Sequence, residues 1–274
     1  MRRPFEVVLA VSTGLILAFL LLPILALFLR IPPEDLLSQL TSEVAVDALI
    51  VSVKTSVIAH AVVLLLGTPT AYLVATRRFR GRSLVLTLIE LPLVLPPAVA
   101  GIALFAAFGR AGLLGDTLDA AGVSIPFTQT AVVFAIIFVS SPFYIRLGIA
   151  AFEGLDPALI DASRTLGAGP RRTFFRVALP LAAGGLSAAS ALAFARGLGE
   201  FGATIMFAGS LQGVTQTLPL AIYAQLAIDF DIALALGAFL VVVSVAVLLT
   251  VKLLPSWTRF TLISLAPSGR SDSS

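Results

Sequence analysis

The sequence contains no cysteine, which excludes disulfide bonds, thiolate metal sites and cysteine nucleophiles. It contains a single histidine, His60, and one imidazole cannot form the histidine clusters that hold zinc. Charged residues make up only 12% of the 274 residues, whereas an ordinary soluble domain has about 25%. With so few reactive side chains, and no pair of acids inside an apolar run, the chain lacks an obvious catalytic set and no metal site is expected.

Hydrophobic residues, by contrast, make up 58% of the chain, and the mean hydropathy is +1.05. Lipid cannot satisfy a free backbone N–H or C=O, so a segment that crosses a membrane is a helix of about 20 mostly apolar residues. The sequence therefore predicts an all-α polytopic membrane protein. We expect six spans, the first too long for a cleaved signal peptide, at residues 5–29, 46–75, 83–108, 128–150, 179–198 and 232–254.

Basic residues are distributed unevenly among the connections between these spans. Thirteen lie on the side that holds both termini: Arg2, Arg3, Arg77, Arg78, Arg80, Arg82, Arg164, Arg171, Arg172, Arg176, Lys252, Arg259 and Arg270. The alternate loops hold only Arg30 and Arg110. The positive-inside rule predicts that both termini lie in the cytoplasm. Membrane topology also explains the net charge of +3, so nucleic acid is not expected as a partner. The expected partner is the lipid bilayer.

Residues 203–228 form an apolar segment that does not fit the six-span count. It contains Gln212, Gly213, Gln216 and Pro219, and a seventh span here would place Lys252 and Arg259 outside, against the positive-inside rule. Irregular backbone at membrane depth is tolerated only where protein or a water-filled cavity lines it. We therefore predict a broken segment on the outer side of the membrane.

The chain has no P-loop for ATP. That motif is G-x4-G-K-[ST], and the chain has only two lysines to supply it. Lys54 precedes Thr55 but has no glycines before it, and Lys252 is followed by Leu253. If ATP drives this protein, a partner polypeptide must bind the nucleotide.

Residues 153–180 form a polar loop between the fourth and fifth spans, and include the stretch LIDASRTLGAGPRRTFFRVALP. Asp156 before Pro157 is typical of a helix start, and Gly167 suits the left-handed position that ends a helix. These signals predict a helix over residues 157–166 and, after Gly169-Pro170, a second one over 171–178. The loop is then a cytoplasmic elbow, which is either a solvated connector or a docking surface.

The spacing of this loop resembles the EAA loop of ABC-importer permeases, E-A-A-x3-G-x9-I-x-L-P. Gly167, Leu179 and Pro180 match it, while Asp161 stands for Glu, Ser163 for Ala and Val177 for Ile. The resemblance implies a coupling helix that docks into a groove of a separate ATPase. The coupling residues it implies are Asp161, Ala162, Ser163, Gly167, Arg171, Arg172, Leu179 and Pro180.

Residues 66–104, 197–209 and 216–223 are similar to the molybdate permeases among the type I ABC importers, and this resemblance covers most of residues 50–225. It implies a single permease domain over residues 1–274 that carries molybdate or tungstate across the inner membrane. It also implies a second copy of the chain, two cytoplasmic ATPases that hold ATP and Mg, an external molybdate-binding protein, and no cofactor on this chain. A sulfate-type permease is the alternative, followed by a secondary transporter, for which only Lys54, His60, Glu90 and Arg196 are available.

A glycine-rich stretch follows the fifth span and is a candidate gate or translocation path. Its candidate residues are Gly199, Glu200, Phe201, Gly202 and Thr204, where glycines permit bending and the threonine offers a hydroxyl. Arg196 lies four residues before Glu200, on the same helix face, and either pairs with it or contacts an anion. Small residues throughout the fifth span predict close helix packing, within one subunit or between two.

Overall fold

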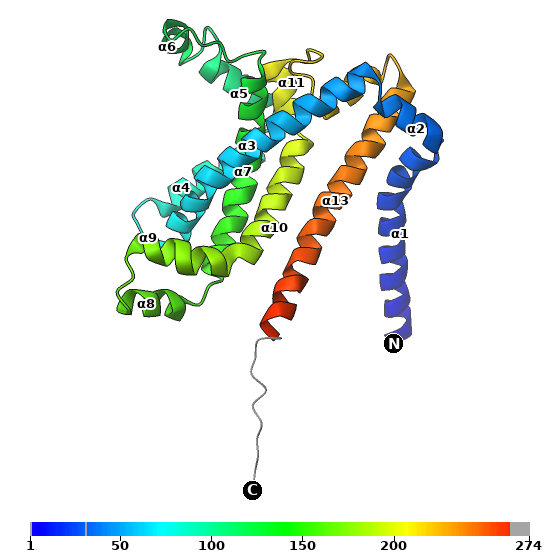
Figure 1. Cartoon of the computed structure of the whole chain (residues 1–274). Coiled ribbons are helices and arrows are strands. Elements are labelled where there is room, and N and C mark those ends of the chain that lie inside the picture. Colours follow the sequence, from blue (N-terminus) through cyan, green and yellow to red (C-terminus); the bar gives the residue numbers. More distant parts are fainter. Residues whose placement is uncertain (1, 31, 264–274) are drawn as a thin grey trace. The chain divides into compact units, whose positions relative to one another are not determined.

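The structure is a computed structural model that describes residues 2–30 and 32–263, and the part of the chain it describes is helical, without strands (Figure 1). Arg270, one of the predicted cytoplasmic charges, lies outside the described residues. The helices are α1 (Arg2–Leu29), α2 (Pro33–Leu40), α3 (Glu43–Thr76), α4 (Arg82–Val94), α5 (Pro97–Phe108), α6 (Gly115–Ala120), α7 (Gln129–Glu153), α8 (Pro157–Thr165), α9 (Pro170–Thr173), the π-helix η1 (Phe174–Ala178), α10 (Leu179–Leu198), α11 (Gly202–Ala208), α12 (Leu218–Gln225) and α13 (Phe230–Ile263).

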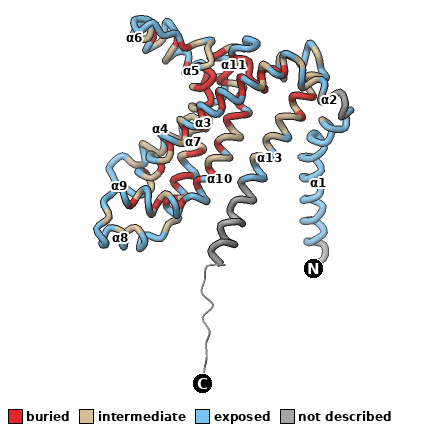
Figure 2. Tube along the Cα trace, viewed as in Figure 1, coloured by how far each residue is buried: buried red, intermediate tan, exposed pale blue. Residues whose placement is uncertain are grey.

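Five of the helices are long and apolar enough to cross a membrane, and α4 with α5 makes a sixth if that bent pair counts as one span. The prediction of an all-α polytopic membrane protein is confirmed. Figure 2 shows α1 exposed along its length, and its apolar side chains from Phe5 onward have few neighbours within the described chain. An apolar surface of this kind suits lipid as the solvent.

The predicted span at residues 83–108 is two helices rather than one, because α4 and α5 meet at an angle of 115°. Leu95 and Pro96, between them, have extended backbone with ψ of 133° and 137°. A proline disfavours the helical conformation in the residue before it, so two consecutive prolines force the break. Pro97 then starts α5, where its missing N–H would have no partner in any case.

The chain divides into two compact units, of which the first comprises Met1–Val53 and Gly209–Ser244. Its core joins the start of α3 to α12 and α13 through Ala45, Ala48, Leu218, Ala221 and Leu236. The backbone N–H of Leu218 donates to the Ser52 hydroxyl at 2.7 Å. This bond satisfies one of the free N–H groups at the start of α12.

The second unit comprises Lys54–Ala208 and Val245–Ser274, and α7 contributes more buried residues to it than any other described helix. One apolar cluster joins α7 to α5 and α11, around Phe207, and another joins α7 to α10 and η1, around Tyr144. Figure 2 shows the buried residues concentrated on α7 and α11. The coupling loop and the candidate gate both belong to this unit, so α7 supports both.

Candidate functional site

The candidate coupling helix α8 begins at the predicted residue. The Asp156 carboxylate accepts a hydrogen bond from the N–H of Ala158 at 2.9 Å, and Pro157 occupies the first turn. The carboxylate satisfies a free N–H and also interacts favourably with the helix dipole. The start of α8 is therefore specified by local sequence.

Gly167 ends α8 in the left-handed conformation, with φ of +82°. The N–H of Ala168 donates to the Ser163 carbonyl at 3.0 Å, and the N–H of Gly167 donates to the Arg164 carbonyl at 2.9 Å. These two bonds form a Schellman motif. A Cβ at position 167 would meet no atom within 4 Å, so conformation rather than space makes this position suit glycine.

The elbow continues into α10 through a π-helical turn. The sequence predicts one regular helix over residues 171–178, whereas the structure has α9 followed by η1, and the N–H of Leu179 donates to the carbonyl of Phe174. Pro180 has no N–H for the carbonyl of Arg176, and its ring would clash with that carbonyl in an α-helix. A widened turn relieves this clash.

A pair of hydroxyl groups joins the two arms of the elbow. Ser163 Oγ on α8 lies 3.1 Å from Thr173 Oγ1 on α9, and Ser163 also donates to the Ile160 carbonyl at 2.8 Å. Thr173 is only 1% exposed. Ser163, at a position where the EAA pattern has alanine, thus ties the arms together. Thr173 was missed in the sequence because the pattern leaves its position unspecified.

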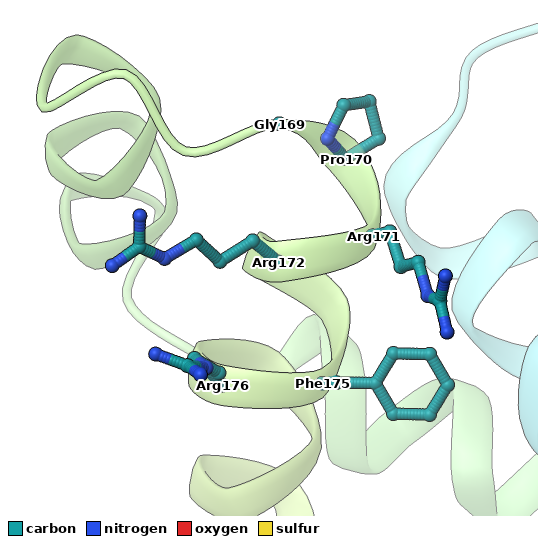
Figure 3. Close-up of a pocket in the computed structure, with 6 residues that line it drawn as sticks. All are labelled: Gly169, Pro170, Arg171, Arg172, Phe175 and Arg176. Carbon is teal, nitrogen blue, oxygen red and sulfur yellow. The ribbon is translucent and has the colours of Figure 1, made fainter.

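The charged side chains of the loop are exposed. Among the described residues, Asp161 forms an ion pair only with Arg164, at 3.3 Å, and both side chains are more than half exposed, so the pair is weak. Ala162 is exposed as well. Figure 3 shows Arg172 and Arg176 on one side of the helix and Arg171 and Phe175 on the other, around a surface cavity of about 840 Å³ that Gly169 and Pro170 complete. Leu179 and Pro180 lie where α10 starts.

An ion pair fixes the connection between α3 and α4 to the end of α7. Arg82 donates from Nη2 to Glu153 Oε1 at 2.6 Å and from Nε to the Val74 carbonyl at 2.9 Å. Both side chains are partly exposed, so the pair adds little to the stability of the fold and acts mainly by positioning the two segments. It supports the helix end from which the coupling loop leaves.

The candidate gate residues lie at the break between α10 and α11. Glu200 is 3% exposed, and its Oε2 accepts from Arg196 Nη1 at 3.0 Å. Its Oε1 accepts from the N–H of Ala203 at 2.8 Å, which satisfies a free donor at the start of α11. The sequence left open an ion pair or an anion contact for Arg196, and the structure contains the ion pair. Gly199 and Phe201 complete the break.

Helix α11 packs against α5 with no room for a side chain at two positions. A Cβ on Gly202 would lie 2.4 Å from Pro97 Cβ, and a Cβ on Gly101 would lie 2.7 Å from the carbonyl oxygen of Ala203. Thr204 is fully buried, and its hydroxyl has no hydrogen-bond partner in the described chain. Sequence reasoning missed Pro97 and Gly101, because nothing local indicates which helix they meet.

Three of the four candidate coupling-ion residues have protein partners. His60 Nε2 lies 2.8 Å from Ser190 Oγ on α10, and Glu90 Oε1 lies 3.6 Å from Arg146 Nε. Arg196 pairs with Glu200. Within the described residues, no group of three or more histidine or acidic side chains is placed to hold a metal ion. These residues tie helices together rather than forming an open ion site.

Comparisons with known proteins agree on one family. Residues 64–260 match the family model described as "Binding-protein-dependent transport system inner membrane component". The molybdenum transport system permease protein ModB of Mycobacterium tuberculosis is 47% identical over 237 residues, which cover 86% of this chain and 89% of that protein. The sulfate transport system permease protein CysW of Synechococcus elongatus is 38% identical over 178 residues, 63% of this chain and 62% of that protein.

The fold also matches a solved structure. A bacterial ABC transporter that imports the acidic polysaccharide alginate contains a chain that aligns with a TM-score of 0.68 at 18% identity, covering 92% of this chain and 95% of that one. The type I ABC-importer permease fold expected from the sequence is therefore confirmed. This chain is a multi-pass membrane protein and belongs to the family of binding-protein-dependent transport system inner membrane components.

Proposed function

We propose that this chain is the membrane subunit of an ATP-driven importer that carries molybdate, or the closely similar tungstate, across the inner membrane. The observation that carries the proposal is the 47% identity with a molybdenum permease over 86% of the chain. The sulfate-type alternative has less support, because the sulfate permease is less similar and covers less of the chain.

The proposed assembly has two copies of this chain, two cytoplasmic ATPases that hold ATP and Mg, and an external molybdate-binding protein. Both termini and the elbow of residues 153–180 lie in the cytoplasm, as the basic residues favour. The exposed surface of α8 and α9 supports a docking role, because helix-in-groove binding needs an exposed, rigid helix. The related alginate importer has been solved with a substrate-bound periplasmic protein.

In the proposed mechanism, α8 sits in the ATPase groove and moves when ATP draws the two ATPases together. The Schellman turn at Gly167 and the Ser163–Thr173 contact keep the elbow rigid, so the movement reaches α10 instead of being absorbed. The break at residues 199–201 lies at the other end of α10 and acts as the gate. Two packed helical states, rather than continuous bending, then give the inward and outward conformations.

Passage of a dianion requires binding weak enough for release. The pairing of Arg196 with Glu200 supports this, because it neutralises a cation near the candidate gate. Selectivity then lies mainly in the external binding protein.

The test is reconstitution of the chain with its ATPase and binding protein in lipid vesicles. We expect ATP-dependent uptake and ATP turnover stimulated by the molybdate-loaded binding protein. Stimulation by the sulfate-loaded binding protein and not by the molybdate-loaded one would show that molybdate is not the substrate. Uptake that collapses with the proton gradient at constant ATP would instead favour a secondary transporter.

A further inference from the structure

Glu200 is the residue that joins the two helix ends at the candidate gate. The backbone leaves the α-helix for only three residues, Gly199, Glu200 and Phe201. Across that break, one carboxylate reaches back to Arg196 in the last turn of α10 and forward to the N–H of Ala203 in the first turn of α11. Oε2 therefore bonds to α10 and Oε1 bonds to α11.

The carboxylate is placed where such contacts are strong. Its side chain is 1% exposed, so water does not compete for either oxygen. Hydrogen bonds that involve a charged group are stronger than neutral ones, and low-dielectric surroundings strengthen them further. Arg196 also lies over the ring of Phe143 on α7, 6.0 Å from its centre, which restrains the guanidinium.

The far side of the break is itself held to a second helix. The close approaches of Gly202 to Pro97 and of Gly101 to Ala203 leave no space between α11 and α5. Close-packed contacts of this kind have low compressibility, so α11 and α5 shift together. A displacement that reaches α11 therefore reaches α5 as well.

We infer that Glu200 is a positioning residue that makes α11 and α5 follow α10, so that the break acts as a rigid joint rather than a free hinge. The inference rests on the proposed transport function and deepens it. Without the carboxylate, the bonds from this residue to Arg196 and to the N–H of Ala203 are lost, Gly199 permits the break to bend, and bending absorbs the displacement of α10. ATP would then be hydrolysed with less substrate carried.

The experiment uses the complete complex in vesicles and measures molybdate carried per ATP hydrolysed. In Glu200→Gln, the amide oxygen still accepts from Ala203, but the amide nitrogen cannot accept from Arg196, so only the α10 contact is lost. We expect the ratio to fall about tenfold, the order of one buried charge-assisted hydrogen bond. Arg196→Lys keeps a cation for the carboxylate, and we expect a ratio close to that of the unmodified chain.

Hydrogen exchange gives a second measurement that does not depend on transport. In Glu200→Ala, the amide of Ala203 loses its acceptor and should exchange faster, while Glu200→Gln should leave it protected. Protection of α7 amides reports whether each variant is folded. If Glu200→Ala does not fold, the comparison of Glu200→Gln with Arg196→Lys decides the question.

The matched control is Asp119→Asn, which removes the pair of Arg110 and Asp119 at 3.2 Å in the same unit. That pair is exposed, so we expect no change in the ratio. An unchanged ratio in a folded Glu200→Gln, or an equal fall in Arg196→Lys, would overturn the inference. Absence of ATP-dependent molybdate uptake by the unmodified complex would contradict the proposed function instead, so the two failures are distinguishable.

Discussion

Gly167 offers the sharpest test of the coupling elbow. Its φ of +82° is a conformation that side chains other than glycine rarely adopt, and a Cβ there would meet no atom within 4 Å. A substitution therefore acts on backbone conformation and not on packing within the described chain. We expect the damage to increase in the order Asn, Ala, Val, because Asn tolerates the left-handed region and a β-branched side chain does not.

The magnitude follows from the cost of that conformation. An alanine in the left-handed region costs about 1–2 kcal/mol. Since about 1.4 kcal/mol is a factor of ten in an equilibrium constant, the fraction of chains with a correctly formed elbow falls by up to about 30-fold. If the ATPase binds only the formed elbow, its apparent Kd rises by the same factor as the competent fraction falls.

The assay is the affinity of the permease for its ATPase in detergent, together with ATP turnover stimulated by the loaded binding protein. Gly169→Ala is the matched control, because Gly169 also has open space around its Cβ but an ordinary φ of −68°. We expect it to bind the ATPase normally. A Gly167→Val chain with unchanged Kd would refute the reasoning, and equal damage at both glycines would indicate a clash with the partner instead.

Two further predictions concern packing and topology. Gly101→Leu should lower the melting temperature in detergent, because overpacking against Ala203 costs about 1–3 kcal/mol. The control is Gly14→Leu, which should leave the melting temperature unchanged because no atom lies within 4 Å of a Cβ at that position. Equal melting temperatures for the two variants would contradict the close contact of α5 with α11. Because the chain lacks cysteine, a single Arg78→Cys or Thr117→Cys reports its side of the membrane. A membrane-impermeant maleimide should label position 117 in intact cells and position 78 only after permeabilisation, and the reverse pattern would overturn the orientation.

Local signals were sufficient for five of the six membrane spans and for the two ends of α8, but not for the division of the span at 83–108 into α4 and α5. Backbone groups in lipid must bond within their own helix, so apolar length alone predicts membrane helices, and α10 has the predicted bounds of 179–198. Asp156, Pro157 and Gly167 act on their own neighbours in the chain, so their positions predict the start and end of α8 to within a residue. The family was inferred from the resemblance of residues 161–180 to the EAA loop and of residues 66–104, 197–209 and 216–223 to molybdate permeases.

Other features depended on which helix faces meet. The prolines at 96 and 97 force the break between α4 and α5, but the 115° angle depends on the packing of α5 against α11 and α7. The contact of Ser163 with Thr173 and the fit of Gly101 on Ala203 likewise had no local signal. The π-turn has a local cause in Pro180, but the prediction of a regular helix over residues 171–178 did not use it.

The sequence by itself determined that this protein lies in the membrane, where five of its six spans run as helices and where the polar elbow begins and turns. Only the tertiary structure decided that one buried carboxylate, Glu200, bonds to both helix ends at the break. The physical reason is the solvent. In water, an apolar stripe shows which face of a helix is buried, but a helix in lipid can be apolar all round, so the pattern does not say which side meets a neighbour.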